Sequence, residues 1–217
     1  MAAATFGTSD VQELQRVAFN GMAAHRTITA DRTNATGSSR SGRTTPMDQV
    51  DQEFGKPNPD APGVLSRFAF LIGRWRCEAK VRLANGEWQM FEATWLGRFI
   101  LDGYAIADEY RMTGSSGELI VLGLNLRAYD AARQIWNIKW LNALAGTWTD
   151  LGPEELGGVR FDGQSIIYAF KEPVADHAYT RATYTNISRT HFTWRGERSD
   201  DGEGWSEFMV VEAYRSQ

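Results

Sequence analysis

The residues Phe70 to Leu83, FLIGRWRCEAKVRL, decide the fold of this chain. From Leu71 onward every second residue is apolar or glycine, and most of the residues between them are charged. Strict alternation is typical of a β-strand with one face buried and the other in water. At about 3.3 Å per residue the strand would be about 40 Å long, which suits a strand that curves around a barrel.

After this strand the chain alternates between short strand-like runs and turns. Asn85-Gly86, Asp102-Gly103 and Asp162-Gly163 are turn signals between such runs. A further glycine, Gly97, is expected to break the second run. Nine or ten strands joined by mostly short links predict an all-β fold, a single antiparallel up-and-down β-barrel. Closing the sheet into a barrel would remove its exposed edges.

Three regions are predicted along the chain. Residues 1–26 form an N-terminal region with a short amphipathic helix at 9–25, which packs on the barrel, covers its mouth as a lid or forms a dimer contact. Residues 27–63 are rich in Ser, Thr, Gly, Asn and Pro and are predicted to be a flexible linker. Residues 64–217 form the barrel.

Composition excludes several classes of function. The net charge of -4 argues against a nucleic-acid partner. A single cysteine, Cys77, excludes an intramolecular disulfide, and we expect no metal and no cofactor. No apolar run reaches the roughly 20 residues of a membrane span. Without a secretory signal a cytoplasmic location is expected, with an organelle transit peptide in residues 16–45 as the alternative. The oligomeric state is left open.

Gly73-Arg74-Trp75 in the first strand, together with Arg215 at the end of the last, resembles the Gly-x-Trp start of calycins, the superfamily that joins lipocalins with fatty-acid-binding proteins. Leu101-Asp102-Gly103, Tyr129-Asp130 and Asp200-Asp201-Gly202 extend the likeness over residues 65–215. The chain is similar to calycin-like barrels described only as a domain of unknown function. The resemblance implies an internal cavity, and a first-strand Trp that packs near the late Arg across the closed end. It transfers no catalytic residue.

Nitrobindin-type haem barrels share this opening and ligate iron through a cavity-facing histidine on a late strand. His191 is the candidate here. In its strand Phe192 and Trp194 form the apolar face, however, and His191 falls on the opposite one. Haem ligation is therefore not expected.

Strand parity predicts which side chains face the cavity. Asp108 shares the apolar face of its strand, and a buried carboxylate requires a partner. Arg181 is the expected partner, and the two residues are the candidate catalytic pair. The alternative is that Asp108 pairs with an inward Arg only to hold the barrel together. The predicted ligand-binding residues are Trp75, Tyr104, Tyr110, Asn125, Arg127, Trp136, Trp140, Tyr184 and Trp194.

An aromatic interior with a few polar groups is typical of small-molecule pockets. We expect the barrel to bind a small apolar or aromatic molecule, as a carrier or sensor. The alternative is a cofactor-independent enzyme of the cyclase, isomerase or lyase type, in which the cavity shapes the substrate. Asp108 would then act as acid or base and Arg181 would hold a carboxylate or carbonyl. A core filled by its own side chains is the third interpretation.

Overall fold

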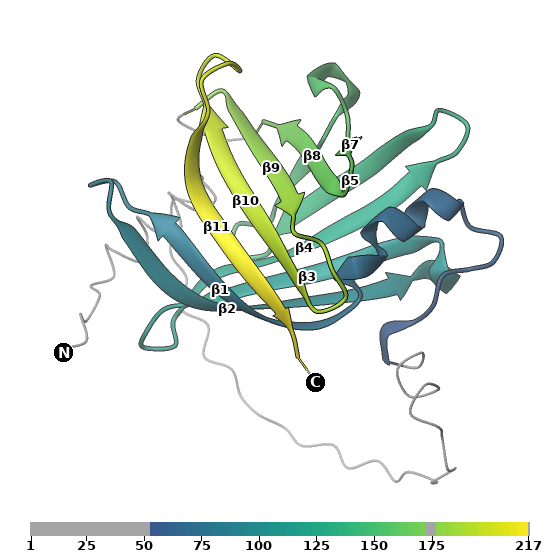
Figure 1. Cartoon of the computed structure of the whole chain (residues 1–217), viewed down its shortest axis with the longest axis horizontal. Coiled ribbons are helices and arrows are strands. Elements are labelled where there is room, and N and C mark those ends of the chain that lie inside the picture. Colours follow the sequence, from purple (N-terminus) through teal and green to yellow (C-terminus); the bar gives the residue numbers. More distant parts are fainter. Residues whose placement is uncertain (1–52, 172–176, 217) are drawn as a thin grey trace, which may run out of the picture.

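A computed structural model describes residues 53–171 and 177–216, and they form one antiparallel sheet of eleven strands (Figure 1). The strands are β1 (Gly73–Arg82), β2 (Trp88–Ile100), β3 (Ala105–Thr113), β4 (Leu119–Asp130), β5 (Ile135–Asn142), β6 (Thr147–Leu151), β7 (Arg160–Asp162), β8 (Ser165–Phe170), β9 (Tyr179–Thr185), β10 (His191–Ser199) and β11 (Ser206–Arg215). Their order is β6-β5-β4-β3-β2-β1-β11-β10-β9-β8-β7. Consecutive strands pair, except that β1 pairs with β11 and β6 does not pair with β7, as a meander rolled up on itself requires.

The expected all-β, barrel-type architecture is confirmed, and the expected number of strands is wrong. The sheet has eleven strands instead of nine or ten, and the strand break expected at Gly97 is also wrong. A Cβ at Gly97 would lie 2.1 Å from the carbonyl oxygen of Leu71, so glycine allows close approach at this position. β2 therefore continues through Gly97 and bends around the barrel as one strand of 13 residues.

The sheet curls, as Figure 1 shows, and strand β6 contacts β8. The amide of Gly152, directly after β6, donates to the carbonyl oxygen of Ala169 in β8 at 3.0 Å. Within the described residues β6 and β7 remain the two edges of the sheet, since they do not pair with each other. The barrel is thus joined at this point by a loop contact and not by a continuous strand pair.

A short helix fills one end of the barrel, and the alternation of apolar residues did not predict it. The strand expected from Phe70 begins at Gly73, and residues Gly63–Leu71 form the 3₁₀ helix η1. Its side chains Leu65, Phe68 and Leu71 are buried, and the helix contacts β2, β3 and β4. Two further one-turn 3₁₀ helices are η2 (Leu101–Gly103) and η3 (Glu154–Leu156).

The closed end has the arrangement that the calycin resemblance implied. The guanidinium of Arg215 lies 4.2 Å from the ring centroid of Trp75. It also donates to the carbonyl oxygens of Ile72 and Arg189, at 2.8 and 2.6 Å. The indole of Trp75 in turn donates to the carbonyl oxygen of Leu71 at 3.0 Å. These bonds connect η1, β1 and β11.

The core continues along β1, where every second side chain is buried. Cys77 belongs to this buried set, and burial raises the pKa of its thiol to about 12. The thiol therefore stays protonated at physiological pH, as expected of a structural cysteine.

The helix predicted at 9–25 and most of the predicted linker lie outside the described residues. The described residues before η1 contact the barrel: Phe54 is buried, Glu53 pairs with Arg74, and the amide of Asn58 donates to the carbonyl oxygen of Gly103. The boundary at residue 64 stays a prediction. No helix in residues 53–171 or 177–216 has the length and apolar character needed to cross a membrane.

The first prediction concerns Gly73, which has a φ of 117° and whose Cβ, if present, would lie 2.3 Å from Nη1 of Arg215. Gly73→Ala combines backbone strain with displacement of that guanidinium, so we expect a loss of about 2 kcal/mol in unfolding free energy. Urea denaturation measures it. Gly63→Ala is the control, because a Cβ there meets no atom within 4 Å. Equal stability of the two variants would contradict this account of the closed end.

Candidate ligand-binding site

A fully buried ion pair lies in the interior of the barrel. Asp108 on β3 and Arg127 on β4 both have 0% exposed side chains. Arg127 donates from Nε to one carboxylate oxygen at 2.7 Å and from Nη2 to the other at 3.1 Å. Trp95 Nε1 and Asn125 Nδ2 donate to the second oxygen at 3.0 and 2.7 Å. The carboxylate is thus bound on several sides, which offsets part of the cost of burying it.

Aromatic rings surround the guanidinium. It lies 4.7 Å from the ring centroid of Phe68 in η1 and 5.9 Å from that of Tyr184 in β9. Its Nη2 also donates to the hydroxyl oxygen of Tyr184 at 3.1 Å. Burial is the largest effect and disfavours the charged guanidinium, but Asp108 together with Tyr184 and Tyr168 outweighs it and holds the pKa of Arg127 above its ordinary range.

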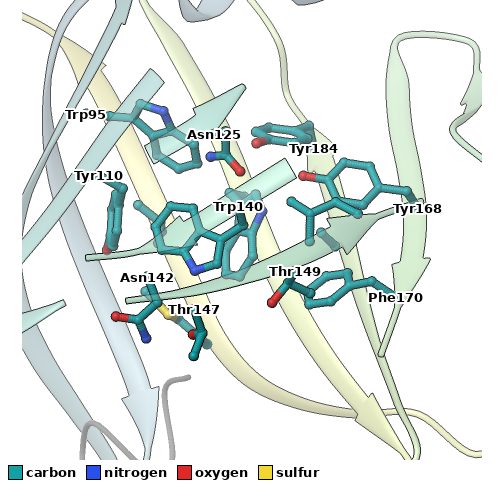
Figure 2. Close-up of a pocket in the computed structure, with 15 residues that line it drawn as sticks. Trp95, Tyr110, Asn125, Trp140, Asn142, Thr147, Thr149, Tyr168, Phe170 and Tyr184 are labelled. Atoms are coloured by element: carbon teal, nitrogen blue, oxygen red, sulfur yellow. The ribbon is translucent and has the colours of Figure 1, made fainter. Parts of the chain in front are cut away.

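A cavity lies next to this network, between the two halves of the sheet (Figure 2). Its empty space is about 690 Å³ with the open mouth included, of which about 60 Å³ admits the centre of a water molecule. About 10–15 Å³ of such space holds one water, so the enclosed part takes only a few heavy atoms and a larger ligand extends into the open mouth. The lining residues are Trp95, Tyr110, Asn125, Trp140, Asn142, Thr147, Thr149, Leu151, Tyr168, Phe170, Ala182, Tyr184, Trp194, Met209 and Val211.

Two glycines give the cavity its aromatic walls. A Cβ at Gly123 in β4 would lie 2.1 Å from ring atoms of Trp140. A Cβ at Gly196 in β10 would lie 2.7 Å from the ring of Trp194 and 2.7 Å from that of Phe208. The absence of side chains at Gly123 and Gly196 gives both indoles the space that they occupy at the cavity wall.

The partner of Asp108 is Arg127, and the expectation that it is Arg181 is wrong. In β9 the fully buried side chains are Thr180, Ala182 and Tyr184, so Arg181 lies on the outer face. There it donates to Glu197 at 2.8 and 2.9 Å and its guanidinium lies 4.2 Å from the ring of Trp205. This outer pair satisfies Arg181 without any contact with the cavity.

The other predicted binding residues fall into three groups. Tyr110, Asn125, Trp140, Tyr184 and Trp194 line the cavity together. Arg127, Trp75 and Trp136 are buried but do not line it: Trp75 contacts Phe192, and Trp136 packs against Phe68. Tyr104 was expected to face inward and does not. It precedes β3, in the turn after η2, and is 45% exposed.

His191 lies on the outer face, as its parity predicted. Its Nε2 is 2.8 Å from a carboxylate oxygen of Glu212, which also accepts a hydrogen bond from Thr193. Within the described part of the chain no three His, Cys, Asp or Glu side chains come together in a group that could hold a metal ion.

Sequence reasoning missed two cavity residues that matter most. Trp95 shares the alternation of Phe91 and Ala93 in β2, a signal that parity could have detected. Tyr168 gave no such signal, because Ile166 to Phe170 in β8 is nearly continuous in apolar residues and either face could be the buried one.

Comparison with known proteins supports the fold. No known family profile matches the chain, and no curated protein matches it in sequence. Among solved structures, Rv2717c from M. tuberculosis superposes with a TM-score of 0.52 at 9% identity, covering 73% of this chain and 100% of that one. The S-type phycobiliprotein lyase CPES from Guillardia theta gives a TM-score of 0.47 at 11% identity, covering 71% and 93%. A redesigned β-barrel, mFAP0, bound to DFHBI gives 0.34 at 14% identity, covering 67% and 99%.

At 9% identity the likeness to Rv2717c shows the fold alone. Together with the Trp75–Arg215 contact and the curled antiparallel sheet, it defines this chain as a calycin-like β-barrel. The buried aromatic cluster around the cavity fits the binding of a small molecule.

The second prediction concerns Asp108→Asn, which nearly preserves shape and leaves the Arg127 charge buried without a counter-charge. We expect a loss of about 3–5 kcal/mol in unfolding free energy, measured by urea denaturation. Asp150→Asn is the control, because Asp150 and its partner Lys139 are both exposed. The control should change stability by less than about 1 kcal/mol. Similar losses in the two variants would contradict the role given to the buried pair.

The third prediction compares two buried tyrosines. The hydroxyl of Tyr110 has no hydrogen-bond partner among the described residues, whereas that of Tyr184 accepts a bond from Arg127. Tyr184→Phe therefore lowers the unfolding free energy by about 1–3 kcal/mol. Tyr110→Phe leaves it unchanged or raises it by about 1 kcal/mol, because it removes an unpaired polar group. Thermal denaturation measures both, and a loss of stability in Tyr110→Phe as large as in Tyr184→Phe would contradict the assignment.

Proposed function

We propose that this barrel binds a small apolar or aromatic molecule in its cavity and acts as a carrier or sensor. One observation supports this most strongly. Tyr110 lines the cavity with only 3% of its surface exposed, and its buried hydroxyl lacks a hydrogen-bond partner among the described residues. A buried polar group without a partner costs free energy, so its presence suits a ligand that supplies the missing hydrogen bond.

The aromatic walls favour a flat ligand. Trp95, Trp140 and Trp194 line the cavity from three different strands, and Phe170 adds a fourth ring. Such rings gain dispersion energy against a planar molecule and cost little conformational entropy to position. A filled core, the third interpretation, is disfavoured by the empty space between these rings.

The enzyme alternative receives less support. Asp108 does not line the cavity and is surrounded by Trp95, Asn125 and Arg127, so it has no open path to a substrate proton. Arg181 lies on the outer face. Binding without chemical conversion is therefore the function that these contacts favour.

The fourth prediction tests binding by filling the cavity. Tryptophan fluorescence should be quenched on titration with at least one member of a panel of fatty acids, retinoids, flavonoids and polyketides. Ala182→Leu adds three carbon atoms to a buried wall position and should abolish that quenching. Ala169→Leu is the matched control, since Ala169 lies on the outward parity of the neighbouring strand β8. No quenching by any compound, or equal quenching in Ala182→Leu, would contradict the proposal.

A further inference from the structure

At one end of the cavity, the Asp108–Arg127 ion pair determines which polar groups are free to donate hydrogen bonds to a ligand and which are free to accept them. Nδ2 of Asn125 lies 2.7 Å from the Asp108 carboxylate, which can only accept. The amide orientation is therefore fixed, and its oxygen is the atom left for another partner. Because Asn125 lines the cavity, that oxygen offers a hydrogen-bond acceptor to a ligand.

A second chain of bonds begins at Arg127. Its guanidinium can only donate, so the Tyr184 oxygen, at 3.1 Å, accepts. The ring of Tyr168 lies 6.3 Å from that of Tyr184 between centroids, and Figure 2 shows the two hydroxyls pointing toward each other. Hydroxyl dipoles align best with their protons pointing away from a cation, so the Tyr184 proton points away from Arg127, toward the side on which Tyr168 lies. The proton of Tyr168 is then available to the cavity that Tyr168 lines.

Both tyrosines and the asparagine lie at the same end of the cavity. In Figure 2 the hydroxyls of Tyr168 and Tyr184 and the amide of Asn125 point toward one another, above the ring of Trp140. An acceptor and a donor are thus presented side by side, next to an aromatic wall.

The cavity wall carries no compensating charge for an ionised ligand. None of the lining residues within the described part of the chain is charged. The charges that contact the lining residues Asn125 and Tyr184 are Asp108 and Arg127, which are paired with each other. A carboxylate entering this site would lose its hydration without gaining a cation, which costs several kcal/mol in a protein interior.

We propose that the cavity selects a neutral, flat aromatic molecule whose edge presents a hydrogen-bond donor to Asn125 and an acceptor to Tyr168, as a carboxamide or lactam does. This inference rests on the proposed function and names the chemical class of its ligand. Asp108 and Arg127 act as positioning residues, since they orient the binding groups without touching the ligand.

The fifth prediction uses three probes of nearly equal shape: naphthalene, naphthalene-2-carboxamide and naphthalene-2-carboxylate. Calorimetric titration of the full chain at pH 7 should show the carboxamide binding about tenfold tighter than naphthalene. The carboxylate should bind at least about tenfold weaker than naphthalene, because its charge is left unpaired.

A variant of Tyr168 tests whether its hydroxyl donates the hydrogen bond to the edge of the ligand. Tyr168→Phe should weaken carboxamide binding about tenfold and leave naphthalene binding unchanged. Tyr179→Phe is the matched control, because Tyr179 lies on the outward parity of β9, and it should change neither affinity. Thermal denaturation of each variant establishes that it is folded before titration.

Each remaining outcome overturns a defined part of the account. A carboxylate that binds as tightly as the carboxamide overturns the preference for neutral ligands. Equal affinities for the carboxamide and naphthalene overturn the proposed hydrogen bonds to the ligand. An equal loss of affinity for both probes in Tyr168→Phe overturns them as well. In these cases naphthalene still binds the wild-type protein, so the proposed function stands. Failure of all three probes to bind contradicts the inference, and the panel titration with its Ala182→Leu arm decides the proposed function separately.

Discussion

The Asp108–Arg127 ion pair places two charges where neither side chain is exposed to solvent. Such a pair adds little to stability by itself, because the loss of hydration consumes much of the attraction. The pair instead fixes the orientation of the side chains around it. The carboxylate orients Trp95 and Asn125, and the guanidinium orients Tyr184. Since these three side chains all line the cavity, the geometry of the candidate site depends on a pair that does not itself reach the cavity.

The closed end of the barrel and the cavity differ in how far the fold itself satisfies their hydrogen-bonding groups. At the closed end Arg215 is bound to backbone carbonyls and covers Trp75, so its hydrogen bonds hold η1, β1 and β11 together. Around the cavity the polar groups retain capacity for another partner, as the Tyr110 hydroxyl does among the described residues. A stable closed end and an unsatisfied cavity are what a binding barrel needs, because the ligand has to be held by groups that the fold does not already use.

Much of the fold followed from alternation, and the exceptions have physical causes. Asp108 and Arg127 were placed inward correctly because β3 and β4 keep a clean period of two between clear turns. Arg181 was misplaced because both faces of β9 mix aromatic and polar residues, and a pairing with Glu197 decides between them only in three dimensions. Gly97 suggested a break because a sequence does not distinguish a flexible glycine from one required by the nearby Leu71 carbonyl. Tyr168 was recognised only once the strands were brought together, whereas the alternation of β2 already carried a signal for Trp95.

The central claim is that the ion pair serves the orientation of the site more than the stability of the fold. The double variant Asp108→Leu/Arg127→Met replaces both charges by apolar side chains and leaves neither charge alone. The decisive measurement is the ratio of its affinities for naphthalene-2-carboxamide and naphthalene. We predict a folded protein, more stable than either single variant, that binds both probes with similar affinity because Asn125 and Tyr184 have lost their orienting partners. A folded double variant that still prefers the carboxamide tenfold would contradict the claim.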